Sequence, residues 1–297
     1  KIIILGYFSY IMYIYILFIC VYLFRFSFIF VKRRPFRFGN IVATMIAITL
    51  TISGFHSHYN KKEVVYHVTV PKTSSVSKLK ICLVSDLHLS SGTYMRQVRK
   101  LVKTVNDKHY DLVCFAGDVF DENTPDALMN RSLQEFKNMK STYGTYWISG
   151  NDEYYGKHTD FTVFEKYNIH FLKNTYETVD NTFNIVGFTD KISHDHYEIN
   201  KVIEGMDTSL PTITLDHNPE RFDQHTYFTD LQLSGHTHNG QIFPGNIILH
   251  YYYQNSYGLS HYKNHYLLVS AGYGSWGFPF RLGTQCEYDT IYLTMRK

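Results

Sequence analysis

Seven side chains of types that bind metal ions follow five separate apolar runs of the chain. They are Asp86, His88, Asp118, Asn151, His217, His236 and His238. A single Asp or His after an apolar run is usually a turn former or a solvated side chain, whereas five such positions favour a metal site. Seven donors exceed the three or four that a tetrahedral zinc ion needs, so they suit two cations that share a bridging carboxylate. Mixed imidazole, carboxylate and amide donors favour Mn, Zn or Fe over Mg or Ca.

Two divalent metal ions about 3.5–4 Å apart can hold a phosphoryl group between them. Such a pair lowers the pKa of a shared water and stabilises the attacking and leaving oxygens of an in-line displacement. The donors therefore indicate an enzyme that hydrolyses a phosphate ester with two divalent metal ions as cofactors. The sequence contains no GxSxG elbow and no P-loop, so nothing in it favours a serine hydrolase or a nucleoside triphosphatase.

The elements that must position these donors alternate between strand and helix patterns. Five apolar runs each end just before a donor, and they cover 80–85, 112–116, 145–149, 212–215 and 231–234. The 3.6-residue spacing of apolar residues predicts amphipathic helices at 94–108 and 127–139. Further strands are expected at 64–70, 266–270 and 289–295. This order predicts an α/β layered domain with mixed sheets, in which ligands bind at the carboxyl ends of strands.

Composition excludes several other classes of protein. Of the 297 residues, 44% are hydrophobic and 19% are charged, which excludes a disordered or fibrous chain. Residues 56–297 hold 23 Lys/Arg, 26 Asp/Glu and all sixteen histidines. A slightly acidic domain lacks the basic surface of a duplex-binding protein, so we expect no nucleic acid as a structural partner. The four cysteines form no CxxC pair, which argues against a zinc knuckle or a disulfide framework.

Two apolar segments precede this domain, at 2–24 and 39–55. At ~1.5 Å per residue the first can cross a hydrocarbon core of ~30 Å, and the second is shorter and milder. A buried core hairpin is the alternative, but the absence of any carboxylate in both segments disfavours it. We therefore expect N-terminal transmembrane helices at 2–24 and 39–55. Because no Met precedes Lys1, we also expect further residues upstream.

A basic loop joins the two apolar segments. Its cationic residues are Arg25, Lys32, Arg33, Arg34 and Arg37. Short basic loops stay in the cytoplasm, so the chain is expected to be a multi-pass protein of the cell membrane with its later residues outside the cytoplasm. Lys61 and Lys62 on the other flank oppose this orientation. The predicted organisation is a membrane region at 1–58, a linker and edge strand at 59–77, and a catalytic domain at 78–297.

Five ordered blocks of sequence carry a family resemblance. They are SDLHLS (85–90), GDVFDE (117–122), GND (150–152), DHNP (216–219) and SGHTHNGQ (234–241). They resemble the blocks of the calcineurin-like metallophosphoesterases, and in particular a branch of membrane-linked bacterial phosphohydrolases. GYGSWGFPFRLG (272–283) is similar to the closing segment of that branch. The resemblance implies a four-layer α/β sandwich, in which two mixed β-sheets are flanked by helices.

The same resemblance implies roles for the donors. Asp86, His88 and His238 would hold the first metal ion, and Asn151, His217 and His236 the second. Asp118 would bridge the two ions, and a hydroxide between them would attack the phosphorus. No ligand of the family pattern is missing from this chain.

One position departs from the family pattern. The family has His directly after the ligand Asn, where this chain has Asp152. In the family that His is oriented by the residue at Asp121 and contacts the phosphate or protonates the leaving oxygen, so Asp152 and Asp121 are the candidate catalytic residues. Three interpretations remain open: a weakened or inactive enzyme, a substrate whose leaving group needs little protonation, and a protonated Asp152 that acts as general acid.

The expected function is a membrane-anchored metal-dependent phosphohydrolase, and the family branch favours a phosphodiester over a monoester. Trp276, Phe278 and Phe280 precede Arg281, and this loop could meet the bilayer while Arg281 binds an anionic oxygen of a lipid-linked substrate. Closure of the core by the three aromatic residues is the competing interpretation. The alternative function is a membrane protein that binds metal and a phosphorylated ligand without efficient turnover.

Overall fold

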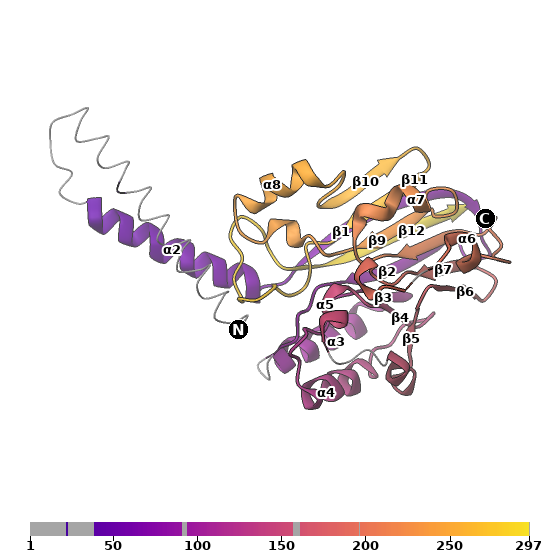
Figure 1. The fold of residues 1–297 in the computed structure, drawn as a ribbon, viewed down its shortest axis with the longest axis horizontal. Coiled ribbons are helices and arrows are strands. Elements are labelled where there is room, and N and C mark those ends of the chain that lie inside the picture. The colour runs from indigo at the N-terminus through magenta and orange to yellow at the C-terminus, as the bar shows by residue number, and fades with distance from the viewer. Residues whose placement is uncertain (1–21, 23–38, 91–93, 157–160, 196, 297) are drawn as a thin grey trace.

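Two six-stranded mixed sheets form the centre of the molecule (Figure 1). The computed structural model describes residues 22, 39–90, 94–156, 161–195 and 197–296. The first sheet has, in spatial order, β1 (Lys62–Thr73), β12 (Glu287–Arg296), β2 (Lys78–Val84), β3 (Leu112–Ala116), β4 (Thr145–Ile148) and β5 (Ile169–Phe171). The second has β10 (Gly258–Tyr262), β11 (His265–Val269), β9 (Leu231–Ser234), β8 (Thr212–Leu215), β7 (Phe183–Gly187) and β6 (Thr175–Val179).

Parallel pairing places the carboxyl ends of the central strands at common edges. In the first sheet β2, β3, β4 and β5 run parallel, and β12 is antiparallel to β2. In the second sheet β7, β8, β9 and β11 run parallel, and β6 and β10 pair antiparallel at the two sides. The predicted mixed sheets are therefore confirmed.

Helices cover the outer faces of both sheets. Those of the first sheet are α3 (Met95–Lys108), α4 (Asp126–Phe136) and η2 (Phe161–Tyr167). Those of the second are α6 (Ile199–Val202) and α7 (Phe222–His225). Short helices also occur in the connections: α5 (Asn151–Tyr155), α8 (Gly245–Tyr252), η3 (Lys191–Ser193), η4 (Pro219–Arg221) and η5 (His238–Gly240).

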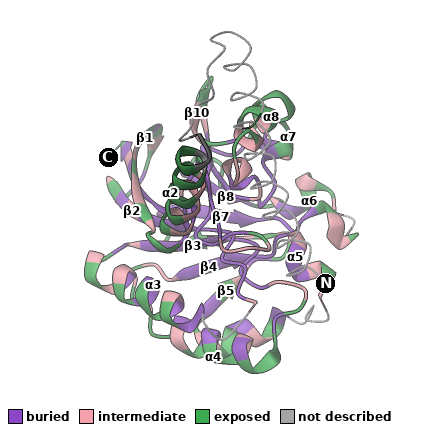
Figure 2. Cartoon of the chain, turned by 90° about the vertical axis from the view of Figure 1, so that its left-hand side faces the viewer, coloured by how far each residue is buried: buried purple, intermediate pink, exposed green. Residues whose placement is uncertain are grey.

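Apolar side chains fill the space between each pair of layers. Ile81 and Leu83 of β2 meet Ile213 and Leu233 of the second sheet in one cluster. The opposite face of the first sheet buries Val98 and its neighbours of α3 in another cluster, and α6 packs on the second sheet. Strands that are buried on both faces read as continuous apolar runs, which is why the sequence showed them clearly (Figure 2).

The segment predicted as the second membrane span is helical, and α2 runs from Gly39 to Tyr59. Within the described part of the chain, however, no helix is both long and apolar enough to cross a bilayer. Thr44, Thr49 and Thr51 interrupt its apolar sequence, so the prediction of a transmembrane helix at 39–55 is not supported. The first predicted span, 2–24, lies outside the described residues except for residue 22.

The last turns of α2 pack on the segment between β11 and β12. The backbone N–H of Arg281 donates to the carbonyl oxygen of Gly54 at 3.1 Å, and Phe55 meets Phe280 edge to face with 5.6 Å between ring centroids. A Cβ atom on Gly54 would lie 2.0 Å from the Phe280 ring, so only glycine permits this approach. The segment 272–283 is thus fixed against α2.

Candidate metal centre

Loops from both sheets bring the seven predicted donors to one place. In the first sheet Asp86 and His88 follow β2, Asp118 follows β3, and Asn151 follows β4. In the second sheet His217 follows β8, and His236 and His238 follow β9. Two compact groups of possible ligands result, Asp86–His88–His238 and Asp118–His217–His236, and in each group the candidate ligand atoms lie within 4.8 Å of one another.

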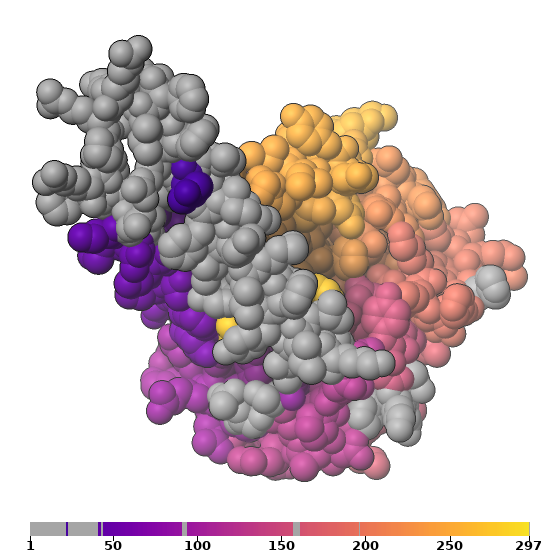
Figure 3. Space-filling model, turned by 60° about the vertical axis from the view of Figure 1, so that its left-hand side comes forward, coloured from indigo at the N-terminus to yellow at the C-terminus, as the bar shows by residue number. Residues whose placement is uncertain are grey.

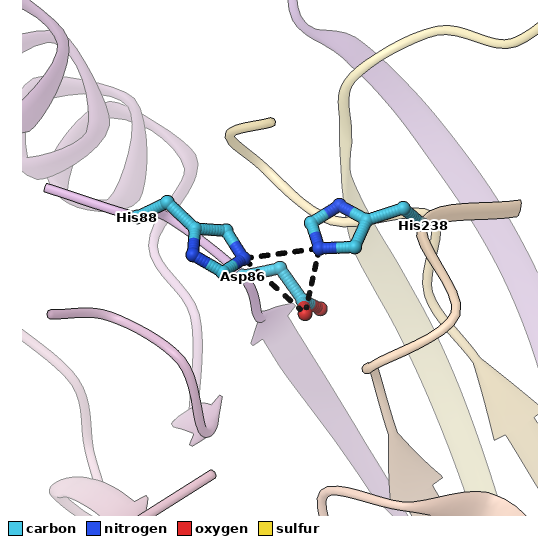
Figure 4. A group of neighbouring side chains, drawn as sticks. All are labelled: Asp86, His88 and His238. Atoms are coloured by element: carbon cyan, nitrogen blue, oxygen red, sulfur yellow. Dashed lines mark hydrogen bonds and ion pairs between the residues drawn. The ribbon is translucent and has the colours of Figure 1, made fainter. Parts of the chain in front are cut away.

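The first group joins the two sheets directly (Figure 4). The Nε2 atoms of His88 and His238 lie 3.0 Å apart. They lie 3.9 and 3.3 Å, respectively, from Oδ1 of Asp86. All three side chains are buried, and their candidate ligand atoms lie close together. This arrangement fits a single cation with two imidazole ligands and one carboxylate ligand.

The second group is centred on Asp118. Its Oδ2 lies 3.1 Å from Nε2 of His217, and Nδ1 of His236 lies 2.8 Å from Oδ1 of Asn151. Asp118 also forms a compact group with His88 and Asp152, so its carboxylate lies between the two donor groups. That position is the one required of a bridging ligand.

The ring of His217 tests whether these residues suit a cation. Its Nδ1 lies 2.7 Å from the carbonyl oxygen of Ala116, which can only accept a hydrogen bond, so Nδ1 carries the proton. Its Nε2 is buried, has no hydrogen-bond partner in the described part of the chain, and faces the carboxylate of Asp118. In a neutral ring two acceptors would then face each other, so a proton or a metal ion must lie between them. Although burial lowers the pKa of His217, Asp118 raises it well above its usual range, which shows the same demand for positive charge.

Five of the seven donors have a left-handed backbone conformation. They are Asp86, His88, Asp118, His236 and His238, with φ between 49° and 70°. This region is uncommon for residues other than glycine and costs of order 1–3 kcal/mol per residue. Such strain is concentrated at functional sites, where the surrounding structure enforces it.

Gly150 allows the loops after β3 and β4 to meet. A Cβ atom at Gly150 would lie 2.2 Å from Oδ1 of Asp118, so a larger residue would displace the candidate bridge. The same oxygen of Asp118 accepts a hydrogen bond from the backbone N–H of Asp152 at 2.8 Å. Asp118 is therefore held by the loop that carries Asn151.

Asp121 and Asp152 both contact His88. Nδ1 of His88 lies 2.6 Å from Oδ1 of Asp121 and 3.3 Å from Oδ2 of Asp152. Burial lowers the pKa of His88, but the charge of Asp121 and the hydrogen bonds that the ring donates to the carboxylates of Asp121 and Asp152 raise it well above its usual range. Asp121 thus orients a candidate ligand in this chain. Burial, and then the charges of Asp118 and Asp121, raise the pKa of Asp152 against the opposing effect of His88.

Arg281 does not have the predicted position. Its side chain is 0% exposed, so it cannot bind an anionic oxygen of a substrate in the cavity. Its guanidinium instead donates to the carbonyl oxygens of His238, Ala271 and Gly274, and Nη2 lies 2.9 Å from Nδ1 of His238. Burial of a guanidinium is costly unless its donors are satisfied, and these backbone carbonyl oxygens satisfy them. Arg281 therefore orients His238.

The sequence analysis missed Glu153. Its buried carboxylate accepts hydrogen bonds from the backbone N–H groups of Asp118, Val119, Phe120 and Gly150, at 2.7–3.1 Å. It therefore joins the loop of the candidate bridge to that of Asn151. Burial, followed by the charge of Asp118, raises the pKa of Glu153 to about 8. The available signal was the capping-box spacing, because Glu153 lies three residues after the N-cap Gly150.

A cavity of about 550 Å³ opens over the donors. Its polar wall includes His88, Asp118, Asn151, Asp152 and both His236 and His238. Its other wall is apolar and is made by Ile242, Ile248, Leu249 and Trp276. The cavity therefore offers a binding place for a small anionic group next to an apolar one.

A family model described as calcineurin-like phosphoesterase matches residues 79–240, more than half of the chain. The chain belongs to this family. The match ends at the loop that carries His236 and His238, so it covers every strand end that presents a predicted ligand. A calcineurin-like phosphoesterase hydrolyses phosphoric esters with divalent metal ions, and the two groups of buried donors suit that chemistry.

Curated relatives share the family name. An uncharacterized metallophosphoesterase of Helicobacter pylori strain J99 is 34% identical over 224 residues, which are 73% of this chain and 60% of that protein. A bovine (Bos taurus) transmembrane protein with metallophosphoesterase domain is 28% identical over 288 residues, 88% of this chain and 64% of that protein. The chain thus spans less than two thirds of the length of these relatives. The crystal structure of TT1561 of Thermus thermophilus is 12% identical, with a TM-score of 0.44, over 65% of this chain and 89% of that one.

Proposed function

We propose that this phosphoesterase hydrolyses a phosphodiester with two divalent metal ions, Mn, Zn or Fe. The observation that carries the proposal is the position of Asp118 between two groups of buried donors. Asp86, His88 and His238 would hold one ion, and Asn151, His217 and His236 the other. When bound, the ions would polarise the phosphoryl oxygens and lower the pKa of a water molecule.

The protein supplies orientation and neutralises charge. Asp121 and Arg281 fix the rings of His88 and His238 from behind, and Glu153 holds together the two loops that carry Asp118 and Asn151. These contacts keep the donors converged before any ion arrives. Preorganised groups need no rearrangement when the charge of the phosphoryl group develops.

Asp152 sets the kind of ester that the site favours. It lines the cavity where the family pattern has His, and its carboxylate contacts His88. Without an imidazole at this position, we propose that the preferred substrates are esters whose leaving group departs with little protonation. The same feature favours a second candidate function, in which the site binds a phosphorylated ligand with little or no turnover.

A metal-reconstitution experiment tests the proposal. The full chain is stripped with a chelator, reloaded with Mn, Zn or Fe, and assayed with bis(p-nitrophenyl) phosphate while bound metal is counted. We expect two ions per chain and hydrolysis that Asp118→Asn abolishes and the exposed control Asp223→Asn leaves unchanged. Two bound ions without hydrolysis at any pH would support the binding protein instead, and no bound metal would contradict both functions.

Variants at position 152 separate the open interpretations. Asp152→His should accelerate hydrolysis of esters with poor leaving groups more than that of nitrophenyl esters, because an imidazole can supply a proton near neutral pH. Asp152→Asn measures what the carboxylate itself contributes. If Asp152→Asn equals the unchanged chain at every pH, Asp152 donates no proton.

We also propose that residues 1–58 attach the domain to the cell membrane and that 59–77 links them to the catalytic domain at 78–297. The apolar sequence at 2–24 supports attachment, as do the exposed Ile41, Met45 and Ile52 of α2. The relatives named transmembrane proteins point the same way. Retention in the membrane fraction after an alkaline carbonate wash tests attachment, and protease cleavage in intact cells tests whether the domain faces outward.

A further inference from the structure

The helix α8 exposes apolar side chains beside the metal centre. Its sequence is GNIILHYY, yet none of its residues is buried, and Tyr251 and Tyr252 are 84% and 80% exposed. A surface helix of a globular domain normally turns its apolar side chains toward the core. The apolar side chains of α8 are therefore available for contact with a binding partner or surface outside the domain.

Neighbouring loops extend this apolar surface. Trp276 is 55% exposed, and its backbone is joined to the loop before α8, because Gln241 donates to the carbonyl oxygen of Trp276 and accepts from its N–H. We call the resulting surface the apolar rim. It comprises Phe243, Ile247, Ile248, Tyr251, Tyr252 and Trp276.

The helix α8, which carries Ile247, Ile248, Tyr251 and Tyr252 of the apolar rim, lies at the same end of the molecule as α2 (Figures 1 and 2). The link between them is aromatic: Phe278, two residues after Trp276, packs against Phe55 of α2 with 5.7 Å between ring centroids. Exposed apolar residues continue along α2, including Ile41, Met45 and Ile48. Figure 3 shows this end of the molecule, with α2 in indigo and the region of α8 in orange. Exposed apolar residues therefore lie both on the helix we assign to the membrane region and at the mouth of the cavity.

Charge identifies the occupant of this surface. Residues 231–286 contain no Asp and no Glu, and their only Lys or Arg residues are Lys263 and Arg281. A surface without carboxylates does not repel the phosphate groups of lipid headgroups. Exposed Trp and Tyr side chains are typical of the boundary between headgroups and acyl chains. Both features match a phospholipid bilayer better than a polar protein partner.

We propose that the apolar rim rests on a phospholipid bilayer and admits an amphiphilic phosphate ester from it. The hydrocarbon chain of the ester lies along Ile248, Leu249 and Trp276, and its phosphate reaches the polar wall of the same cavity. This inference rests on the proposed function and names the substrate class. It also gives the apolar wall, which a free sugar phosphate would not use, a role in binding.

Trp276 provides a direct test that does not depend on activity. The chain has two tryptophans, and Trp147 is buried in the core. The full chain is placed in vesicles of phosphatidylcholine and phosphatidylglycerol whose phosphatidylcholine is either plain or brominated along its acyl chains. We expect brominated lipid to quench the Trp276 emission and vesicles to shift it to shorter wavelength, while Trp276→Phe removes both effects.

A relocated tryptophan controls for attachment by other parts of the chain. Tyr227 is 59% exposed and follows α7 in the chain, and Figure 1 shows α7 apart from α8. In a Trp276→Phe, Tyr227→Trp double variant the emission should not respond to brominated lipid. Equal quenching at both positions, or none at Trp276, would overturn the proposal. A shift that depends on protein concentration rather than on lipid would overturn it in favour of a second copy of this chain.

Chain-length dependence tests the substrate class. In a series of p-nitrophenyl alkyl phosphodiesters, kcat/KM should rise by up to about fourfold for each methylene that enters the apolar wall, since burial of one CH₂ contributes ~0.8 kcal/mol. Ile248→Ser should flatten this dependence, and Tyr227→Ser should not. A flat series in the unchanged chain overturns the inference alone. No hydrolysis of any ester contradicts the proposed function, and the quenching result then still decides the contact with the bilayer.

Discussion

The two walls of the metal centre are built from different chemistry. The wall from the first sheet is rich in carboxylates, with Asp86, Asp118, Asp121, Asp152 and Glu153. The wall from the second sheet supplies His217, His236 and His238, and residues 231–286 of this wall contain no carboxylate. Among the residues that line the cavity, the carboxylates Asp118 and Asp152 both come from the first sheet, so the other side meets an anionic or apolar ligand without a carboxylate.

The two walls also satisfy buried charge in different ways. On the second sheet, buried Asp216 is paired with Arg221 through two hydrogen bonds of 3.0 and 2.6 Å. On the first sheet, Glu153 relies on backbone N–H groups, and Asp289 of β12 has no hydrogen-bond partner for either carboxylate oxygen among the described residues. Bound cations would stabilise the charged forms of the carboxyl groups in the first wall, which is the electrostatic basis of the proposed site.

Replacement of Asp118, the carboxylate between the two walls, should have the largest effect on activity. Asp118 is the candidate bridging ligand, and its carboxylate faces His217. Asp118→Asn keeps the shape of this side chain but removes its charge. We expect activity to fall on the order of 10³-fold, beyond the ~10–100-fold typical of residues that only support ligands. Metal content and hydrolysis by the same preparation check this. Unchanged metal content in Asp118→Asn would show that the walls bind ions independently.

The support of the first wall should matter next. Glu153→Gln leaves one acceptor oxygen for four backbone N–H groups and turns an NH₂ group toward some of them. We expect metal affinity to fall about 10–100-fold, as for other groups that orient ligands. Isothermal titration with Mn measures it, with Glu122→Gln as the matched control because Glu122 accepts from the side chain of neighbouring Asn123 at the surface. Equal metal affinities in Glu153→Gln and Glu122→Gln would contradict a role of Glu153 in metal binding.

Arg281 orients His238 of the second wall, and its replacement should lower metal affinity less than Glu153→Gln does. Lys at this position retains the charge but cannot reach the carbonyl oxygens of His238, Ala271 and Gly274 from one ammonium group. We expect about tenfold weaker metal binding for Arg281→Lys, at the lower end of such effects. Exposed Arg96 of α3 gives the control Arg96→Lys. If Arg281→Lys lost more metal affinity than Glu153→Gln, support of the second wall would matter more than support of the first, contrary to this prediction.

The smallest expected effect concerns pH and the buried Asp289. Burial, followed by the charge of Glu287, raises the pKa of Asp289 well above its usual range. The folded chain therefore holds a proton that the unfolded chain releases, and the free energy of unfolding should fall as pH rises above about 4. Asp289→Asn should reduce this slope, whereas Asp216→Asn, which breaks the pair with Arg221, should destabilise the chain. Urea unfolding at several pH values checks both, and equal slopes with and without Asp289 would contradict the assignment.

The sequence predicted the strands well because burial on both faces leaves an unbroken apolar run. The run at 112–116 coincides with β3, and those at 212–215 and 231–234 coincide with β8 and β9. Since each donor follows such a run, the convergence of all seven could be predicted from the ends of strands. The strands β5, β6, β7 and β10 were not predicted; β7 is buried throughout, but Asn184 interrupts its apolar run.

Long-range contacts were harder to predict. The inward direction of Arg281 depends on carbonyl groups of Ala271 and Gly274, and nothing in the local sequence shows that they will be free to accept. Glu153 likewise acts on a loop more than thirty positions earlier. For the second apolar segment, at 39–55, the structure has the helix α2, but the prediction that this helix spans a membrane is not supported.

Anomalous diffraction from crystals of the full chain loaded with Mn tests the central claim most directly. The account predicts two peaks about 3.5–4 Å apart. One should lie among Asp86, His88 and His238, the other among Asn151, His217 and His236, with Asp118 between them. A single peak, or peaks away from these side chains, would contradict a shared dinuclear centre built by the two walls.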